Sequence, residues 1–229
     1  YATKLFISFP DSIEYFRVKR DKIVLSGNPV RKEFEHIDKD SSKLKLNLDN
    51  QKKIILSFGG SGGARKFNQL VIGIAEKLSD REDIVVYHAT GKRYYEEFNR
   101  IDNLPENLKY FEYIDDMPLY MGAADFVIAR SGAITLAEIS TLGLPAILIP
   151  SPNVANDHQM KNAKAFERAK AALIIRENDF DLQNITFQLK NILDDENLLS
   201  EMGANSKRVL LHNAGFIIAD EILKHFKEV

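Results

Sequence analysis

The chain has 229 residues, a formal net charge of −2 and 45% hydrophobic residues, values typical of a globular protein with one large domain or one domain and part of another. A charge so close to zero argues against a general nucleic-acid binder, whose basic face usually shows in the overall balance. The absence of cysteine excludes disulfides, zinc–thiolate sites and cysteine nucleophiles. The sequence also lacks an apolar run of ~18 residues, the length that a membrane-spanning helix needs.

The first 26 residues differ from the rest of the chain. They contain an apolar strand over residues 5–9, a Pro-Asp turn and a second apolar run over residues 23–25. The sequence begins almost directly with a strand, so we expect residues 1–26 to be the end of a preceding domain and its connection. Such a strand normally joins a sheet, and we expect an exposed edge or a dimer contact here. The polar residues 38–51 predict an exposed connection.

A repeated strand–helix pattern begins near residue 53. Apolar runs rich in β-branched residues alternate with turn signals and helical patterns, and the runs are continuous rather than alternating. This pattern predicts strands buried on both faces, in an α/β fold with a doubly wound, Rossmann-like parallel sheet. The predicted strands cover residues 54–58, 84–87, 110–114, 126–128, 146–149 and 173–175, and the predicted helices cover residues 68–78, 134–142, 156–169, 181–193, 197–211 and 216–226.

A glycine-rich loop over residues 59–64 follows the first strand of the predicted sheet. Glycines let the backbone approach a phosphate, and the helix that follows adds the positive end of its dipole. Ser61 can donate its hydroxyl there, and Arg65 either supplies charge or faces solvent. The loop lacks the Gly-Lys-Ser/Thr ending of a P-loop, and no acidic residue after the second strand is placed to hold the ribose of NAD. A strand-to-helix turn without a ligand is the alternative.

A second helix is predicted to begin at the same edge of the sheet. It opens after a buried strand, so the backbone N–H groups of Ala133, Ile134 and Thr135 face any ligand there. Thr135 and Glu138 lie three residues apart on one helix face, where a carboxylate can accept two hydrogen bonds from a ribose diol. A capping box with Ser131 as N-cap is the alternative, but it would place the acid one turn earlier.

Two further loops carry polar groups near predicted strand ends. Pro29 makes a rigid turn that can aim Arg31 at a phosphate. A polar loop after residue 149 leads into a helix whose first residues, His158 and Gln159, can hydrogen-bond sugar hydroxyls. Considered alone, the first segment is no more than a turn, and ordinary helix capping by Asn156 or Asp157 is favoured for the second.

Five segments form one ordered set: residues 27–31, 59–64, 114–117, 130–138 and 150–162. Taken together they resemble the MurG family of peptidoglycan N-acetylglucosaminyltransferases, over nearly the whole chain. That family has the two-domain GT-B glycosyltransferase fold, in which the N-terminal domain binds the lipid acceptor and the membrane and the C-terminal domain binds UDP-N-acetylglucosamine.

The resemblance implies a division of the chain into three parts. Residues 1–26 would be the remnant of the N-terminal acceptor domain and its connection, and residues 27–214 the donor-binding domain. Residues 215–229 would form a C-terminal helix that returns toward the missing N-terminal domain. The chain as a whole would then be the C-terminal half of a GT-B glycosyltransferase.

The resemblance also implies a reaction and its partners. N-acetylglucosamine would pass with inversion from UDP to undecaprenyl-pyrophosphoryl-muramyl-pentapeptide, without a metal ion or other cofactor and with no nucleic acid partner. The intact protein would be cytoplasmic and peripheral on the cytoplasmic face of the bacterial inner membrane. A donor-binding subunit of a split two-chain N-acetylglucosaminyltransferase is one alternative. Another GT-B enzyme, such as a UDP-N-acetylglucosamine 2-epimerase or a natural-product glycosyltransferase, is the other.

The implied contacts to UDP use residues from several segments. Tyr113 would lie against the uracil ring, and the backbone of Ile114 would read its edge. Glu138 would hold the ribose hydroxyls. Arg31, Ser61 and the amides of the glycine loop would serve the diphosphate.

The implied contacts to the sugar come from two helix starts. The amides of Ala133, Ile134 and Thr135 would lie near the phosphates and the sugar. His158 and Gln159 would meet the hydroxyls of N-acetylglucosamine. Family members often have Gln at position 158, where His158 can still donate.

Two features set the chain apart from the whole family pattern. Family members often have Gln where Gly62 stands, so a side-chain contact is lost and only the Gly62 backbone is left to bind. The histidine that the family is thought to use as general base has no counterpart here. We therefore expect no catalytic residue in this chain, and an inactive fragment. The histidines outside the motifs are interpreted as structural or surface residues, and they are His36, His88, His212 and His225.

Overall fold

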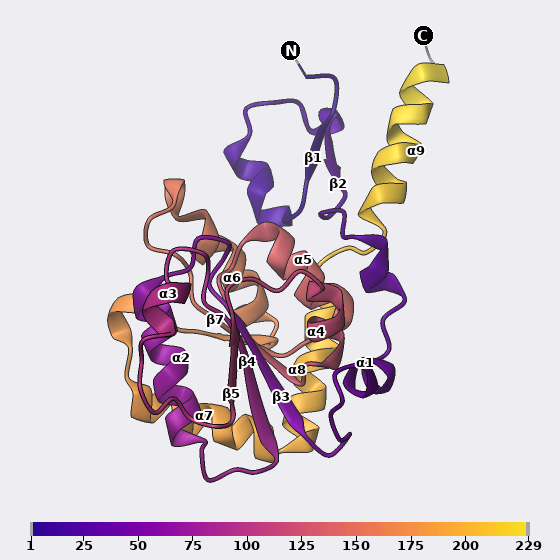
Figure 1. The fold of residues 1–229 in the computed structure, drawn as a ribbon. Helices are drawn as coiled ribbons and strands as arrows, with labels where there is room; N and C mark the ends of the chain where they lie inside the picture. Colours follow the sequence, from indigo (N-terminus) through magenta and orange to yellow (C-terminus); the bar gives the residue numbers. More distant parts are fainter. Residues whose placement is uncertain (1, 228–229) are drawn as a thin grey trace.

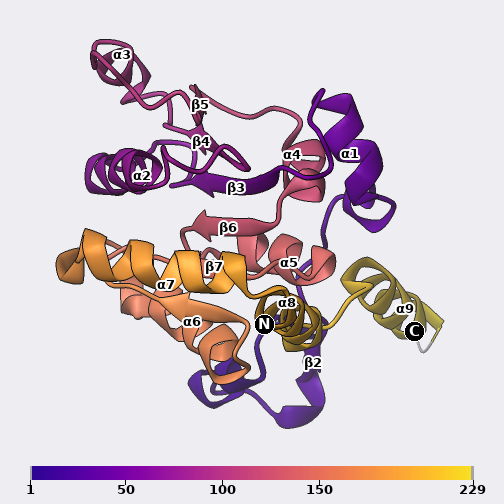
Figure 2. The same cartoon turned by 90° about the horizontal axis from the view of Figure 1, so that it is seen from below.

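The computed structural model describes residues 2–227, in which a six-stranded parallel sheet forms the centre of the fold (Figure 1). The strand order is β5–β4–β3–β6–β7–β8, and Figure 2 shows β5, β4, β3, β6 and β7 one above another in this order. The strands are β3 (Lys53–Phe58), β4 (Ile84–Ala89), β5 (Leu108–Phe111), β6 (Phe126–Ala129), β7 (Ala146–Leu148) and β8 (Ala172–Ile174). The α/β fold class and the six strands are confirmed, although β5 begins and ends earlier than predicted.

Helices cover both faces of this sheet. Side chains of α2 and α7 pack on one face, and side chains of α4, α5 and α6 pack on the other. The α-helices are α1 (Lys39–Lys45), α2 (Arg65–Lys77), α3 (Tyr95–Phe98), α4 (Met117–Ala123), α5 (Ala133–Leu142), α6 (His158–Arg168), α7 (Leu182–Asp194), α8 (Glu196–Val209) and α9 (Ala214–Lys227). The short 3-10 helices are η1 (Pro10–Tyr15), η2 (Arg20–Lys22), η3 (Lys32–Glu35), η4 (Ala155–Asp157) and η5 (Glu177–Asp179). Within residues 2–227, no helix has the length and apolar content to cross a membrane.

The central strand β3 shows why continuous apolar runs form this sheet. Ile54 and Leu56 pack into the core beside α4 and α5, whereas Ile55 packs on the opposite face against α2. All three side chains are fully buried. Because successive side chains of a strand point to opposite faces, a strand covered on both sides needs an apolar residue at every position.

Residues 38–51 differ from the prediction of an exposed connection, because they contain α1 and a buried charge. Asp38 caps α1 by accepting a hydrogen bond from the backbone N–H of Ser41 (2.9 Å). The side chain of Lys43 is buried, and its Nζ lies 3.3 Å from Oδ2 of Asp125. The apolar periodicity that reveals a helix is absent here because an ion pair fills part of the buried face.

The N-terminal segment forms a second, small sheet that stands with α9 outside the main body (Figure 1). Strands β1 (Leu5–Ile7) and β2 (Ile23–Leu25) pair in parallel, as a two-stranded sheet. The Nζ of Lys4 lies 2.8 Å from the carboxylate of Glu221 on α9, so the small sheet and α9 are in contact. A two-stranded sheet is marginally stable alone, and this one therefore depends on contacts with its surroundings.

The order of the strands changes direction between β3 and β6. From β3 the chain adds β4 and β5 on one side, and then crosses to add β6, β7 and β8 on the other. The carboxyl ends of β3 and β6 are neighbours, with Phe58 paired to Ala129. Open α/β sheets bind their ligands in the crevice at such a switch point. The glycine loop and the segment that opens α5 therefore leave the sheet side by side.

Candidate functional site

A cavity of about 510 Å³ lies at the carboxyl edge of the sheet. The glycine loop after β3 contributes Gly60 and Gly63, and the start of α5 contributes Gly132 and Thr135. Gln159, in the first turn of α6, lines it as well. The structure therefore brings together three of the five segments that the sequence indicates, at the switch point of the sheet.

The helices α2, α5 and α6 begin at this cavity without a side-chain cap. Neither α2 nor α5 has a side-chain hydrogen bond at its N-cap, whereas α1, α4, α7 and α8, whose first turns do not line the cavity, are each capped by an aspartate. The hydroxyl of Ser131 donates to the carbonyl oxygen of Gln159 (2.8 Å), so the capping-box alternative is wrong. The N–H groups of Ala133, Ile134 and Thr135 are therefore left without helical partners, which favours a bound anion.

Basic side chains add to this positive environment. Arg65, Lys66, Arg93 and Arg130 line the cavity, against one acid, Glu177. Arg130 forms an ion pair with Glu177, and Arg65 pairs with an acid outside the cavity. Across residues 2–226, Lys66 and Arg93 have no ion-pair partner. The excess of positive charge suits a ligand with at least two negative charges, such as a diphosphate.

Close backbone contact explains why the loop is rich in glycine. Gly63 has a φ of 69°, and a Cβ added there would lie 2.1 Å from the carbonyl oxygen of Thr90. Gly91 has a φ of 83°, and a Cβ added there would lie 2.2 Å from the backbone nitrogen of Gly63. The loops after β3 and β4 thus touch backbone to backbone, which glycine allows and other residues do not. An added Cβ at Gly62 meets nothing within 4 Å, so this position has room for a side chain.

A buried histidine joins three elements beneath the glycine loop. His88, at the end of β4, is fully buried, and its Nδ1 lies 3.2 Å from the hydroxyl oxygen of Ser57 on β3. Its Nε2 lies 3.1 Å from Oδ1 of Asn68 on α2, and the Asn68 amide donates to the carbonyl oxygen of Thr90 (3.0 Å). In a neutral imidazole, Nε2–H therefore donates to Asn68 and Nδ1 accepts from Ser57. The structure thus agrees with the interpretation of His88 as structural.

Acidification is expected to destabilise the protein through His88. Burial lowers the pKa of His88 from 6.5 to about 3, so the folded protein favours the neutral ring. The stabilisation is complete above pH 6.5 and is lost as the pH falls through 6.5 toward 3, by up to about 1.4 kcal/mol per pH unit. Urea unfolding at pH 7.5 and 5.5 measures this loss. The control is His88→Gln. If the free energy of unfolding of this variant decreases equally between the two pH values, His88 is not the source of the decrease.

Glu138 occupies α5 one turn beyond the free N–H groups. Its side chain is half-buried, and among residues 2–226 it forms no hydrogen bond or ion pair. Burial raises the pKa of Glu138, and the nearby charge of Arg31 acts in the opposite direction. A carboxylate held this way, beside a cation and without a protein partner, has both oxygens ready to accept hydrogen bonds from a diol.

Tyr113 and Ile114 lie beyond β5, in the loop that leads to α4. The ring of Tyr113 is 50% exposed, so it can stack on a planar group, whereas the side chain of Ile114 is in the core. Only the backbone of Ile114 is then available to a ligand. Neither residue lines the 510 Å³ cavity, and neither do Arg31 and Glu138. A ligand that reaches all four must extend beyond the cavity.

The first turn of α6 separates the two residues expected to meet the sugar. Gln159 lines the 510 Å³ cavity, and its Oε1 accepts a hydrogen bond from the backbone N–H of Ser151 (2.8 Å). His158 lines a different cavity, and its Nδ1 lies 2.9 Å from the carbonyl oxygen of Ala155. Among the described residues, no side-chain hydrogen bond caps α6, so the alternative of ordinary capping by Asn156 or Asp157 is wrong.

Comparison with known proteins identifies the family. The model of the glycosyltransferase family 28 C-terminal domain matches residues 54–214, more than half of the chain. The chain belongs to this family. The fold class predicted from the resemblance is confirmed with it, because the solved structures that share the fold include GT-B glycosyltransferases such as MurG.

Relatives of this family 28 domain are longer proteins. A UDP-N-acetylglucosamine--N-acetylmuramyl-(pentapeptide) pyrophosphoryl-undecaprenol N-acetylglucosamine transferase of Finegoldia magna is 37% identical, over 98% of this chain and 61% of its own length. The protein of the same name from Clostridioides difficile is 38% identical, over 97% of this chain and 55% of its own length. The crystal structure of Acinetobacter baumannii MurG superposes with a TM-score of 0.72 at 26% identity, over 96% of this chain and 59% of that one.

Three side chains of the cavity in this family 28 domain were not predicted from the sequence. Lys66 and Arg93 lie outside the five segments, and Arg130 begins the segment of residues 130–138 but was given no role there; only the fold shows that the three converge. Arg93 had one usable signal, because it follows β4 at the same edge as the glycine loop. Arg130 also lies over the ring of Phe67, 5.5 Å from its centroid, and this contact stabilises the position of the guanidinium group.

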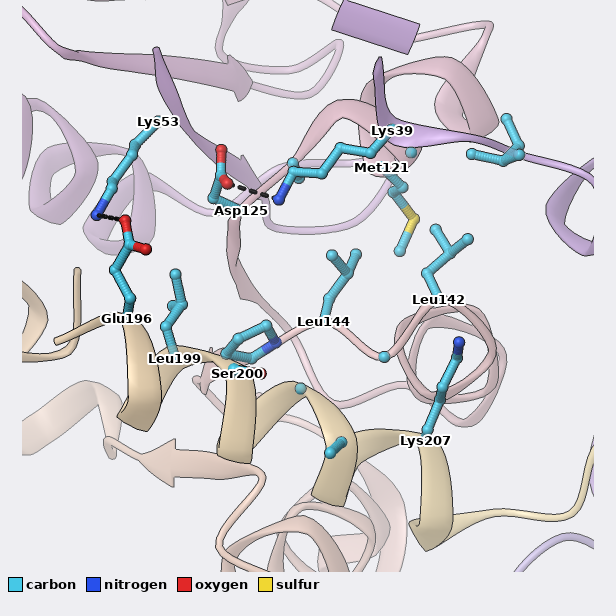
Figure 3. Close-up of a pocket in the computed structure, with 17 residues that line it drawn as sticks. Lys39, Lys53, Met121, Asp125, Leu142, Leu144, Glu196, Leu199, Ser200 and Lys207 are labelled. Carbon is cyan, nitrogen blue, oxygen red and sulfur yellow. Dashed lines mark ion pairs between the residues drawn. The ribbon is translucent and has the colours of Figure 1, made fainter. Parts of the chain in front are cut away.

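A second hollow, of about 630 Å³, lies at the opposite edge of the sheet, where the strands begin (Figure 3). Figure 3 shows two of its lysines paired with acids: Lys39 with Asp125 at 2.6 Å and Lys53 with Glu196 at 3.7 Å. None of the predicted site residues lines it. Most of its charge is neutralised internally, so this hollow has less capacity for an anion than the cavity of the family 28 domain at the carboxyl edge.

Proposed function

We propose that this family 28 domain binds UDP-N-acetylglucosamine as the donor domain of an inverting glycosyltransferase. The observation that carries the proposal is the anion site at the switch point, where the glycine loop meets the uncapped starts of α2 and α5. The names of the relatives supply the substrates: N-acetylglucosamine would be added to N-acetylmuramyl-pentapeptide pyrophosphoryl-undecaprenol in peptidoglycan synthesis. The intact protein would then be a hexosyltransferase.

The nucleoside would extend from the cavity toward the exposed ring of Tyr113. The uracil would stack on that ring, and the Ile114 backbone would bind its edge. The ribose hydroxyls would donate to Glu138, with Arg31 near the phosphates. The half-buried carboxylate of Glu138, which has no partner among residues 2–226, supports this assignment.

The diphosphate and the sugar would occupy the cavity itself. Ser61 and the backbone amides of the loop, Gly62 included, would bind the phosphates. The amides of Ala133, Ile134 and Thr135 would bind phosphate and sugar. Gln159 would lie beside the sugar hydroxyls there, and His158 would have to reach them from the neighbouring cavity that it lines.

The chain would contribute leaving-group stabilisation to the reaction. As the bond from the sugar to UDP breaks, negative charge builds on the diphosphate, and oriented N–H groups and arginines are worth most at this point. The acceptor hydroxyl also has to lose a proton to a base. The predicted site contains no residue assigned to that role, so the base would come from the acceptor domain, and the chain alone would be inactive.

The ends of the chain would belong to the interface with that acceptor domain. Residues 1–26 would be its remnant, residues 27–214 the donor domain, and residues 215–229 a helix that returns toward it; of these, residues 1, 228 and 229 lie outside the described residues. The exposed Phe216 and Phe226 of α9 and the small β1–β2 sheet support this division. A dimer through the N-terminal segment is the competing use of that sheet. The acceptor domain would hold the intact protein on the cytoplasmic face of the membrane.

Calorimetric titration with UDP-N-acetylglucosamine, UDP and uridine tests the proposed function. We expect saturable binding of the two nucleotides and much weaker binding of uridine, which lacks the diphosphate. Arg93→Ala should weaken UDP binding about tenfold and leave uridine unchanged, because one charge-assisted contact to phosphate is removed. Lys77→Ala, an exposed cation at the far end of α2, is the matched control. A folded chain that binds no UDP would contradict the proposal.

A further inference from the structure

The side chain of Arg130 connects four segments around the donor cavity. Arg130 directly follows β6, and its side chain is 11% exposed. Its Nη1 donates to the carbonyl oxygens of Ile149 (3.1 Å) and Pro150 (3.2 Å), in the loop after β7. Its guanidinium group lies over Phe67 of α2, and its Nη2 pairs with Glu177 of η5. Arg130 therefore holds the loop after β7 against the rest of the site.

Glu177 supplies the negative charge of this cluster. It reaches the cavity from η5, in the loop after β8, and its side chain is 14% exposed. Among the described residues that line the cavity, it is the one acid. A carboxylate opposes the binding of a diphosphate nearby, because like charges repel. Its presence here thus needs another reason, and its pairing with Arg130 provides one.

The loop that Arg130 holds also orients the side chain of Gln159. Ser151 follows Pro150 in this loop, and its backbone N–H donates to Oε1 of Gln159 (2.8 Å). Because a backbone N–H group can only donate, the side-chain atom of Gln159 that faces it is the oxygen. Nε2 of Gln159 has no hydrogen bond within residues 2–226, and the side chain lines the cavity. Gln159 therefore presents a donor to a ligand.

The backbone of Gln159 is held by separate contacts. The hydroxyl of Ser131, at the start of the α5 segment, donates to the carbonyl oxygen of Gln159 (2.8 Å). In return, Nδ2 of Asn162 on α6 donates to the carbonyl oxygen of Ser131 (3.2 Å). These bonds do not involve Glu177. Loss of Glu177 would therefore release the side-chain amide of Gln159 and leave the start of α6 in place.

We propose that Glu177 is a positioning residue for the sugar end of the donor cavity. Through Arg130 it holds the loop after β7, and this loop keeps the amide NH₂ group of Gln159 directed at an acceptor oxygen of the sugar. The inference rests on the proposed function, because it takes its ligand from that reaction. Without Glu177, the unpaired guanidinium group of Arg130 would turn toward the diphosphate and release the loop.

Calorimetric titration of Glu177→Ala with UDP and with UDP-N-acetylglucosamine tests this inference. We expect the ratio of the two affinities, UDP-N-acetylglucosamine over UDP, to decrease about tenfold, because one hydrogen bond to the sugar is lost. UDP should bind at least as tightly as to the unmodified chain, since Arg130 becomes available to phosphate. An equal loss of affinity for both ligands would show a general disturbance of the site and would overturn the inference.

Two further variants provide the rescue and the control. Glu177→Gln should restore most of the affinity ratio, because its amide oxygen still accepts a hydrogen bond from Arg130. Asp179→Asn removes a charge from the same turn, at a residue that forms no ion pair among residues 2–226, and should bind both ligands like the unmodified chain. If Glu177→Ala binds no UDP, Glu177→Asp replaces it with the same expectation, because its shorter side chain separates the carboxylate from Arg130.

A double variant shows whether Glu177 acts through Gln159. Gln159→Ala should lower the affinity ratio, and the addition of Glu177→Ala should lower it no further, because the side chain to be oriented is already absent. A further decrease in the double variant overturns the inference and leaves the proposed function standing. An unchanged ratio in a Glu177→Ala variant that binds UDP does the same. Failure of the unmodified chain to bind either nucleotide contradicts the proposed function instead.

Discussion

Gly63→Ala is expected to lower the free energy of unfolding by about 3 kcal/mol and to abolish nucleotide binding. Alanine in the left-handed region costs about 1–2 kcal/mol, and relieving the 2.1 Å contact with the Thr90 carbonyl oxygen adds a cost of similar size. The loop can relieve this strain by moving away from the β4 loop, which would take its N–H groups out of position. Urea unfolding measures the first effect, and calorimetric titration with UDP measures the second.

Gly62→Ala is the matched control for that prediction. The two glycines are adjacent, but Gly62 lies outside the left-handed region and an added Cβ meets no atom within 4 Å. We expect its free energy of unfolding to change by less than about 0.5 kcal/mol, and UDP binding to persist. Equal destabilisation in the two variants would show that the described packing of the loop is wrong.

Glu138→Ala is expected to weaken binding of UDP-N-acetylglucosamine about 100-fold. Two hydrogen bonds from a diol to a carboxylate contribute about 3 kcal/mol together, and alanine removes both. Glu76→Ala, an exposed acid on α2, is the control and should bind normally. Unchanged affinity in Glu138→Ala would remove Glu138 from the site.

The same residue gives the binding a pH dependence. Burial raises the pKa of Glu138 above 4.5 in the free protein, and hydrogen bonds from a ligand would lower it again. Affinity should therefore be full above the raised pKa and should decrease as the pH falls through it. Calorimetric titrations with UDP-N-acetylglucosamine from pH 7.5 to 4.5 measure this decrease in affinity. Glu138→Gln should bind more weakly throughout and lose this dependence; if it keeps the same dependence, another group is responsible.

The core of the fold follows from the sequence because its signals are local. The run around Ile54–Leu56 has no polar interruption, which a strand covered on both faces requires. Gly143 ends α5 in the left-handed conformation expected of a glycine C-cap. By contrast, the helix around Lys43 was missed because its buried partner, Asp125, is distant in sequence. A pattern of apolar spacing carries no information about such an ion pair.

The candidate site likewise has one part that the sequence predicts and another part that only the fold shows. The glycine loop and the start of α5 were predictable because the backbone conformation of each depends on residues that are consecutive in the sequence. The convergence of Arg93 and Arg130 on that loop depends on strand order, which brings β4 and β6 to either side of β3. Likewise, only the fold shows that His158 and Gln159, adjacent in sequence, line two different cavities.

Backbone amide NMR shifts on titration with UDP-N-acetylglucosamine test the central claim most directly. The account predicts large shifts at Gly60 and Gly63 of the glycine loop and at Ala133 of α5. It predicts small shifts at Gly122 and Gly203, which line the hollow at the opposite edge of the sheet. Shifts concentrated at that opposite edge, with the glycine loop unchanged, would contradict it.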